Sequence, residues 1–415
     1  MDAIGRFVLK CRDTRLLVFE FSRDYFGTLG LEIIERNYAA DHLMPWGIGE
    51  DENSFYQWLS ARALPRNRKH AEKLCYAAGS NIYDVSGMCA FSLGLSLNDS
   101  YWTPREGDER RFQDVSLYRN DFSSALASIA FTGQLSGKIG PHELTPEFAT
   151  DGTLHKAWRI DGADSRVLYK GASNGWVPGE PLSELISSYI ARWAGLDSVR
   201  YELDSWYGET CSVCECFCNE SVAYESFARA TGISDLGTAL AFCARLGEGP
   251  FEALRDMLVF DCLVLNRDRH FSNFGLLRSP VTGDVIGLAP IFDNGRALLP
   301  AVPTAQLDNV KFRGATMAPA FGASSFDRLA DLIMGPRQHE WLLGLADLDF
   351  TSLIDEYAGT PFHAEVLARC EGLEGHLRAR ACELARIEPL SMDEMRPMLE
   401  HAWETGSSCW HDRLD

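Results

Sequence analysis

The chain has 415 residues, of which 46% are hydrophobic and 24% are charged, and its formal net charge at pH 7 is −20. This length accommodates two or three domains, and the composition is that of an ordinary globular protein rather than of a disordered one. Because binding to a phosphate backbone requires clustered lysine and arginine, the negative charge argues against nucleic acid as a direct partner. The sequence has no signal-peptide core near its start and no apolar stretch of membrane-spanning length, which predicts a cytoplasmic protein that does not contact a membrane.

The first part of the chain predicts a small α+β unit. Turn-prone residues separate two strands at 15–21 and 31–36, helices follow at 54–63 and 68–78, and a polar, aromatic segment from residue 95 forms an ordered connector. The second helix carries most of the basic run RNRKHAEK (66–73). This run is either a solvated helix face or a surface for an acidic partner, and we favour the solvated face.

The next part predicts a strand-rich unit that opens with a helix, DFSSALASIAFTG (121–133). A strand, a turn at Asp151–Gly152 and a returning strand that carries Lys156 follow it. A loop that covers the phosphates of a nucleotide usually has several glycines, whereas this turn has one, so its residues alone indicate a hairpin. The apolar strand SRVLYKG then ends near Lys170, and a helix spans residues 180–195.

Two further strands are expected at 201–206 and 210–217, and a cysteine-rich segment, CSVCECFC (211–218), overlaps the second of them. Cys211, Cys214, Cys216 and Cys218 provide enough thiols for a zinc site, but the usual pair of C-x-x-C knuckles is missing. The last three cysteines alternate along the chain, which places them on one face of a strand. We favour a buried strand face over a metal site.

The last part predicts a helical unit. Two helices, at 236–246 and 251–265, precede a polar loop, and helices at 326–334, 340–345, 362–387 and 393–404 follow it. Between these two groups, the string VLNRDRHFSNFGLLRSPVTGDVIGLAPIFDNG (264–295) predicts a loop, a hairpin that turns at 282–284 and an apolar strand that stops at Asp293.

The polar residues of this string fit phosphoryl transfer. That reaction requires a base for the acceptor hydroxyl and ligands for Mg²⁺. Asn273 follows Asp268 by five residues, which is the spacing of base and metal ligand in a kinase catalytic loop, and the Asp293 carboxylate suits a hard cation. Asp and Asn are also common in turns for conformational reasons, so it is the complete string that favours the kinase interpretation. We therefore predict Asp268 as the base, Asn273 and Asp293 as metal ligands, and His270 as a residue that packs the loop.

A kinase also requires a strand lysine for the α- and β-phosphates and a carboxylate from the following helix that holds it. Lys170 lies in the right place for this lysine, and the helix at 180–195 offers Glu180 and Glu184. The apolar stripe of that helix leaves Glu184 on the opposite side, where a solvated residue would equally lie. The positions of Glu180 and Glu184 around the helix therefore do not decide which of them pairs with Lys170.

The strings NRDRHFSNFG and APIFDNG resemble the HipA-like protein kinases, whose catalytic loop reads N-x-D-x-H-x-x-N. Asp-Arg-His-x-x-Asn also resembles the phosphoinositide kinases, but their companion motif reads Asp-Phe-Gly, and Asp-Asn-Gly departs from it. SLNDSYW resembles HipA-like proteins that carry an N-terminal domain, and GEPLSEL favours Glu184 as the partner of Lys170. The resemblance implies ATP and Mg²⁺ as cofactors, and Lys170, Glu184, Asp151, Gly152 and His270 as nucleotide-binding residues.

We therefore expect an α+β protein with a bilobal, protein-kinase-like fold. It would consist of an N-terminal accessory domain (1–120) that binds a substrate or partner, a small lobe (121–220) and a large lobe (221–415). The resemblance implies a serine/threonine protein kinase of HipA-like type, with an antitoxin-like protein as a possible regulatory partner. The alternatives are a kinase for a small-molecule or lipid hydroxyl and a nucleotide-binding module with little activity. The sequence does not determine the acceptor, the oligomeric state or regulation by autophosphorylation.

Overall fold

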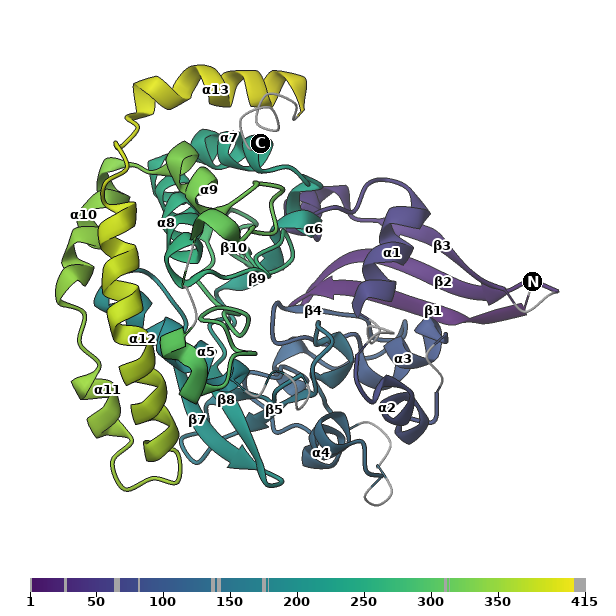
Figure 1. The fold of residues 1–415 in the computed structure, drawn as a ribbon. Helices are drawn as coiled ribbons and strands as arrows, with labels where there is room; N and C mark the ends of the chain where they lie inside the picture. Colours follow the sequence, from purple (N-terminus) through teal and green to yellow (C-terminus); the bar gives the residue numbers. More distant parts are fainter. Residues whose placement is uncertain are drawn as a thin grey trace.

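The structure is a computed structural model that describes residues 2–25, 28–62, 68–80, 83–135, 139, 143–173, 177, 179–309, 312 and 314–406. Antiparallel sheets occupy the first half of the chain and most of the helices occupy the second half (Figure 1). The predicted α+β class, with a strand-rich small lobe and a helical large lobe, is confirmed. Among the described helices, none is both long and apolar enough to traverse a lipid bilayer.

The chain opens with a four-stranded sheet in the order β3-β2-β1-β4. Alternating phenylalanines of β1 and β2, Phe7, Phe19 and Phe21, form one apolar face, and Phe55 of α1 packs edge-on against Phe19. Both strands predicted here are found, and β1 and β4 are additional ones. The elements of this part are β1 (Asp2–Cys11), β2 (Thr14–Arg23), β3 (Leu29–Arg36), η1 (Tyr38–Leu43), α1 (Glu52–Arg62), α2 (Ala71–Ala77), α3 (Val85–Ser92), β4 (Tyr101–Trp102) and η2 (Phe112–Asp114). Ala63, the predicted end of the first helix, lies outside the described residues.

A second four-stranded sheet, in the order β5-β6-β8-β7, forms the small lobe. Its strands are β5 (Lys156–Ile160), β6 (Arg166–Lys170), β7 (Tyr201–Trp206) and β8 (Glu209–Glu215), with helices α4 (Ser124–Thr132) and α5 (Glu180–Trp193). The strand predicted before Asp151 is wrong, because the chain there forms a 3-10 turn, η3 (Glu147–Ala149). Glu147 is buried in this turn and its carboxylate accepts a hydrogen bond from the backbone N–H of Trp158, so it holds the turn against β5 instead of extending it.

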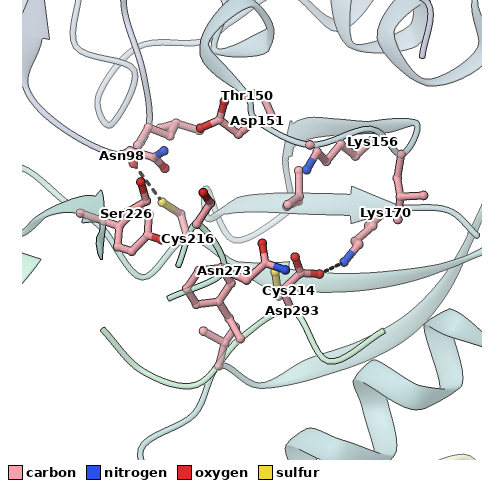
Figure 2. A pocket seen from close by; sticks show the side chains of 18 of the residues that line it. Asn98, Thr150, Asp151, Lys156, Lys170, Cys214, Cys216, Ser226, Asn273 and Asp293 are labelled. Atoms are coloured by element: carbon pink, nitrogen blue, oxygen red, sulfur yellow. Dashed lines mark hydrogen bonds and ion pairs between the residues drawn. The ribbon is translucent and has the colours of Figure 1, made fainter. Parts of the chain in front are cut away.

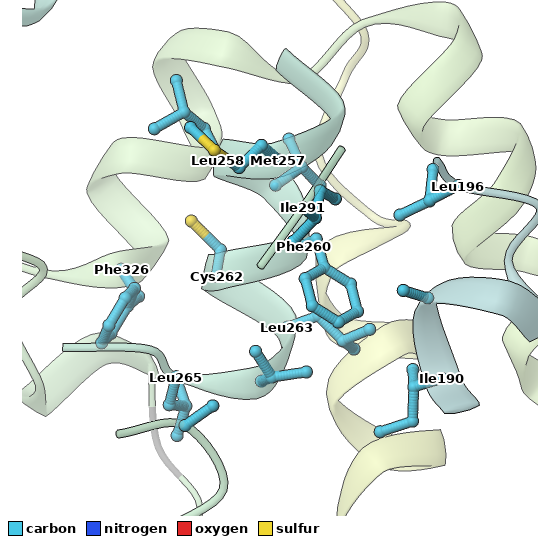
Figure 3. Close-up of a cluster of buried hydrophobic side chains, with 14 of the residues drawn as sticks. Ile190, Leu196, Met257, Leu258, Phe260, Cys262, Leu263, Leu265, Ile291 and Phe326 are labelled. Atoms are coloured by element: carbon cyan, nitrogen blue, oxygen red, sulfur yellow. The ribbon is translucent and has the colours of Figure 1, made fainter. Parts of the chain in front are cut away.

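The large lobe is built around α8, whose last two turns are buried, mostly among apolar residues (Figure 3). A three-stranded sheet, β11-β10-β9, lies beside it. The helices predicted here are found within a few residues, and α6 and α11 are additional ones. The elements are β9 (Ala223–Ser226), α6 (Phe227–Thr231), α7 (Leu236–Leu246), α8 (Glu248–Val264), β10 (Gly275–Arg278), β11 (Val285–Leu288), η4 (Thr304–Asn309), η5 (Gly314–Thr316), α9 (Phe326–Ile333), α10 (Pro336–Gly344), η6 (Leu345–Asp347), α11 (Thr351–Glu356), α12 (His363–Leu384) and α13 (Met392–Thr405).

The N-terminal part contacts both lobes. Its apolar core is continuous with residues of the small-lobe sheet, including Val167 and Tyr169. On the other side, the Arg278 guanidinium at the end of β10 donates to the backbone carbonyls of His42 and Met44. The N-terminal part is therefore packed against both lobes and is not a separate unit on a linker. The domain boundaries near residues 120 and 220 stay predictions.

The basic run at 66–73 is not a uniform solvated face, which corrects part of that prediction. Arg68 is buried before α2 begins, and its guanidinium pairs with the buried Glu147 carboxylate at 2.6 Å and donates to the Lys156 carbonyl at 2.8 Å. Lys69 and Lys73 are exposed, and residues 66 and 67 lie outside the described residues. Arg68 therefore anchors the N-terminal part to β5.

We expect Arg68→Met to lower the free energy of unfolding by about 3–5 kcal/mol, because it leaves the Glu147 carboxylate buried without its partner. Urea denaturation of the full chain measures this loss, with the exposed Lys73→Met as the matched control. Adding Glu147→Gln to Arg68→Met should recover part of the loss. An Arg68 variant as stable as the Lys73 variant would contradict this role.

Candidate active site

A cavity of about 500 Å³ lies between the small-lobe sheet and the loops of the large lobe (Figure 2). The connector before the small lobe also reaches it, through residues 96–98. All predicted site residues except Glu184 line this cavity: Asp151, Gly152, Lys170, Asp268, His270, Asn273 and Asp293. Segments more than a hundred residues apart in sequence thus converge on one place.

The Lys170 ammonium, at the end of β6, lies between two carboxylates. It pairs with Glu184 of α5 at 2.7 Å and with Asp293, which is the interaction drawn in Figure 2. Burial alone lowers the pKa of a lysine, but the two carboxylates overcome this effect and hold the pKa of Lys170 above its ordinary value. Lys170 and Lys156 likewise outweigh burial at Asp293 and hold the pKa of that carboxyl well below its usual range.

Glu184 is fully buried, so the solvated alternative for this residue is excluded. The side of α5 opposite its apolar stripe does not face solvent, because it packs against the loop that follows β11 and leads into the large lobe. There the second carboxylate oxygen of Glu184 accepts the backbone N–H of Asn294 at 2.7 Å. Glu180, the other glutamate of this helix, pairs with Arg296 instead.

The loop after α8 presents Asp268 and Asn273 to the cavity. The Asn273 amide nitrogen donates to the Asp268 carbonyl at 2.8 Å, which fixes the side chain and leaves its oxygen available to a metal ion. Asp268 is exposed, and no described residue is recorded as a hydrogen-bond or ion-pair partner of its carboxylate. The His270 ring accepts the Ser272 N–H at 3.2 Å, which agrees with a role in holding the loop.

Arg269 holds this loop in place and was not predicted from the sequence. Its buried guanidinium pairs with Asp261 of α8 at 2.9 Å and donates to the carbonyls of Asn273 and Phe292 at 2.8 and 2.6 Å. A further bond of 2.7 Å goes to the amide oxygen of Asn294. One side chain therefore fixes the Asp268–Asn273 loop, the residue before Asp293 and the residue after it.

Asp293 has a left-handed backbone conformation, with φ 58°. Non-glycine residues adopt this region infrequently, and such positions cluster at functional sites. The flanking bonds from Arg269 to Phe292 and Asn294 hold the backbone in this conformation. The Asp293 carboxylate consequently faces Lys170 and the cavity.

The turn at Asp151–Gly152 lies at the rim of the cavity. The Asp151 carboxylate pairs with Arg229 at 3.1 Å, so it binds the start of the large lobe rather than projecting toward an anion. Gly152 has φ 98°, and a Cβ atom at this position would lie 2.4 Å from the Lys156 ammonium nitrogen. Burial lowers the pKa of Lys156, a cavity residue that the sequence did not single out, to about 8.

The four cysteines of segment 211–218 divide between two environments. Cys211 is buried in the apolar core that joins the N-terminal part to the small lobe. β8 ends at Glu215, and Cys214, Cys216 and Cys218 all line the cavity, so their common face is a cavity wall rather than a closed core. In the described part of the chain, no three His, Cys, Asp or Glu side chains are grouped as they would be to hold a metal ion.

The sequence matches no protein-family model and no curated protein. In fold, the chain is similar to a HipA from Shewanella oneidensis, solved with HipB and operator DNA, with a TM-score of 0.45, 13% identity, and 98% of this chain and 96% of that chain covered. It is also similar to the Helicobacter pylori proinflammatory kinase CtkA, with a TM-score of 0.42, 18% identity, and 55% of this chain and 95% of that chain covered. A HipA protein, of the family whose motifs this sequence resembles, is thus among the solved structures similar to this chain.

We expect Arg269→Met to lower the free energy of unfolding by about 3–5 kcal/mol, because the buried Asp261 carboxylate loses its partner. Arg269→Lys should recover only part of the lost free energy of unfolding, since a lysine ammonium does not reproduce the planar set of N–H donors of the guanidinium. The measurement is urea denaturation, and the exposed neighbour in Arg267→Met serves as the control. Equal stability of the two methionine variants would rule out Arg269 as the support of this loop.

Proposed function

We propose that this protein is an ATP- and Mg²⁺-dependent serine/threonine protein kinase of HipA-like type. One observation carries the proposal: a single cavity is bordered on one side by the Lys170–Glu184 pair and on the other by Asp268, Asn273 and Asp293. A lysine held by a helix glutamate, a base and two oxygen ligands are the parts that phosphoryl transfer to a hydroxyl requires. The cavity volume of about 500 Å³ also suits a nucleotide-sized ligand.

The residues present fit a magnesium ion. Asn273 and Asp293 supply oxygen donors, and Mg²⁺ prefers a small number of such ligands together with water and phosphate oxygens. A magnesium ion held by Asn273 and Asp293 would neutralise negative charge that develops on the phosphates. Asp293 pairs with Lys170 in this structure. Only one carboxylate oxygen of Asp293 takes part in this pair, so the other would hold the ion while Glu184 keeps Lys170 in place.

Asp268 has the features of a general base for the acceptor hydroxyl. Its carboxylate is exposed at the cavity, and its backbone is fixed by the bonds from Asn273 and Asn266. A general base must first lie within hydrogen-bond reach of the proton that it removes. The buried Arg269 guanidinium holds the Asp268 loop in a fixed position. Asp268 thus takes the proton as the hydroxyl oxygen attacks.

The exposed position of Asp268 and His270 favours a macromolecular acceptor over a small molecule, because an acceptor on a protein surface reaches an open rim more readily than a closed pocket. A small-molecule or lipid hydroxyl remains the second candidate, since the same groups act on any hydroxyl. An antitoxin-like regulatory protein, the absence of nucleic-acid binding and cytoplasmic location stay predictions.

Asp268→Asn should lower turnover by roughly 10²- to 10⁴-fold, because the substitution keeps the size of the side chain and removes the proton acceptor. Transfer from labelled ATP to proteins of a cell lysate measures turnover, and calorimetry should give unchanged ATP affinity. Asp284→Asn, in the exposed hairpin turn, is the control. Undiminished transfer by the Asp268 variant would refute its assignment as the base.

Asp293→Asn should remove most of the contribution of Mg²⁺ to nucleotide binding, since it deletes the one charged ligand of the metal. Calorimetric titration with ATP in the presence of Mg²⁺ and then of EDTA measures this contribution in each protein. We expect a clear difference between the two conditions for the wild type and little difference for the variant. The metal would have to lie elsewhere if the variant kept the full difference.

A further inference from the structure

The turn at Asp151–Gly152 is attached at both of its ends to one side of the cavity. Before the tip, the Thr150 hydroxyl oxygen accepts the indole N–H of Trp158 at 3.2 Å. After the tip, the Thr153 carbonyl accepts the backbone N–H of Lys69 at 3.3 Å. These bonds tie the ends of the turn to the small lobe and to the N-terminal part.

The tip of the turn is bound to the other lobe by one ion pair. The Asp151 carboxylate meets the Arg229 guanidinium of α6 twice, at 3.1 and 3.2 Å, and both residues line the cavity. Figure 2 shows Asp151 on this side of the cavity, across from Asn273. Among the hydrogen bonds and ion pairs recorded for the described segment 147–156, those of Asp151 are the ones that reach the large lobe. Because both side chains are exposed, water competes for this pair and it opens readily.

Arg229 has a second carboxylate within reach. Glu225 of β9 lies 3.8 Å from the guanidinium nitrogen that also pairs with Asp151, which is longer than a charge-assisted hydrogen bond. The next cation, Arg62, is itself paired with Asp99 at 2.5 Å. Burial raises the pKa of Glu225 to about 7, and the attraction of Arg229 opposes this effect. Glu225 is thus a half-buried carboxylate whose charge Arg229 compensates only in part.

Two carboxylates from different lobes therefore compete for one guanidinium. When Arg229 binds Asp151, the turn is held at the cavity. When Arg229 moves fully to Glu225, which lies four residues earlier in the same lobe, the tip of the turn is free. Arg229 has a counter-ion in both states, so the exchange does not leave a desolvated charge without a partner. Such an arrangement has two discrete states, and either can be favoured by a small change.

We propose that Arg229 is a positioning residue that holds the Asp151–Gly152 turn closed over the cavity and releases it by moving to Glu225, so that this exchange sets the rate at which a nucleotide leaves. The inference rests on the proposed kinase function for the identity of the ligand, whereas the two states of the turn belong to the protein itself. Gly152, with φ 98°, supplies backbone freedom at the tip. Opening of a segment that covers a site commonly limits release from that site.

Two substitutions should change the release rate in opposite directions. Asp151→Asn removes the bond that closes the turn and should speed release about two- to five-fold, the effect of one exposed ion pair. Glu225→Gln removes the competing carboxylate and should slow release about two-fold. The measurement is stopped-flow displacement, by excess unlabelled ATP with Mg²⁺, of ATP that carries a methylanthraniloyl fluorophore on its ribose.

Combined variants separate the exchange from a plain effect of charge. Loss of a negative charge at the cavity would by itself slow the release of an anion, so faster release from Asp151→Asn has the opposite sign. In the Asp151→Asn protein, Glu225→Gln should have no further effect, because the turn no longer offers Arg229 a carboxylate. Asp151→Glu should release the nucleotide more slowly than Asp151→Asn. Glu356→Gln breaks a comparably exposed pair with Arg200, of 2.6 Å, outside the cavity and should match the wild type.

Equal release rates in the wild type, Asp151→Asn and Glu225→Gln would overturn the inference. A full effect of Glu225→Gln in the Asp151→Asn protein would overturn it as well, because Glu225 would then act by its charge alone.

Hydrogen exchange of the protein without nucleotide tests the two states of the turn independently. After correction for intrinsic rates, the amides of residues 150–156 should exchange faster in Asp151→Asn and slower in Glu225→Gln than in the wild type. If exchange responds in this way but the wild type does not bind the fluorescent ATP, the closing of the turn stands and the kinase function is refuted. If the wild type binds this ATP and neither exchange nor release responds, the kinase function stands and the role of Arg229 is refuted. A response of exchange without one of release would refute control of nucleotide release by this turn.

Discussion

The arrangement of the site depends on one buried guanidinium. Arg269 lies between the end of α8 and the two loops that carry the polar residues of the cavity, and its charge is balanced by Asp261. Its planar fork reaches backbone carbonyls on both loops at once, which a point charge such as a lysine ammonium does not do. Asp268, Asn273 and Asp293 all line the cavity, and Arg269 supports the backbone of both loops that carry them.

Lys170 connects this rigid base to the small lobe. It has two carboxylate partners, one from α5 and one from the loop that follows β11. Glu184 also accepts the N–H of Asn294, so the helix is tied to the same loop that Arg269 supports. Ion pairs and hydrogen bonds therefore connect the Arg269-supported loop of the large lobe, through Glu184, to the strand that carries Lys170. Lys156, the cross-strand partner of Lys170, also lines the cavity, and its charge helps to hold the pKa of the Asp293 carboxyl low.

The N-terminal part bears on the site through packing. Residues 96–98 form part of the cavity wall, where the Asn98 carbonyl accepts the Tyr224 N–H at 2.7 Å. Arg278 binds the same part of the molecule from the large lobe, and Arg68 binds it to β5. Whatever else this part binds, its removal would expose the core that it shares with the small-lobe sheet and would open the cavity on one side.

The sequence by itself determined the class of the fold, most of the strands and helices, and the residues whose spacing carries their chemistry, such as Asp268 and Asn273. These follow from periodicity and from distances along one loop, which are local properties. Only the tertiary structure decided that Glu184 is buried against Lys170, that Arg68 and Arg269 are internal, and that Lys156 lies opposite Lys170 at the cavity. A helical or strand pattern states which residues share a face, but the element that packs against that face decides whether a charge there is solvated, paired or left for a ligand.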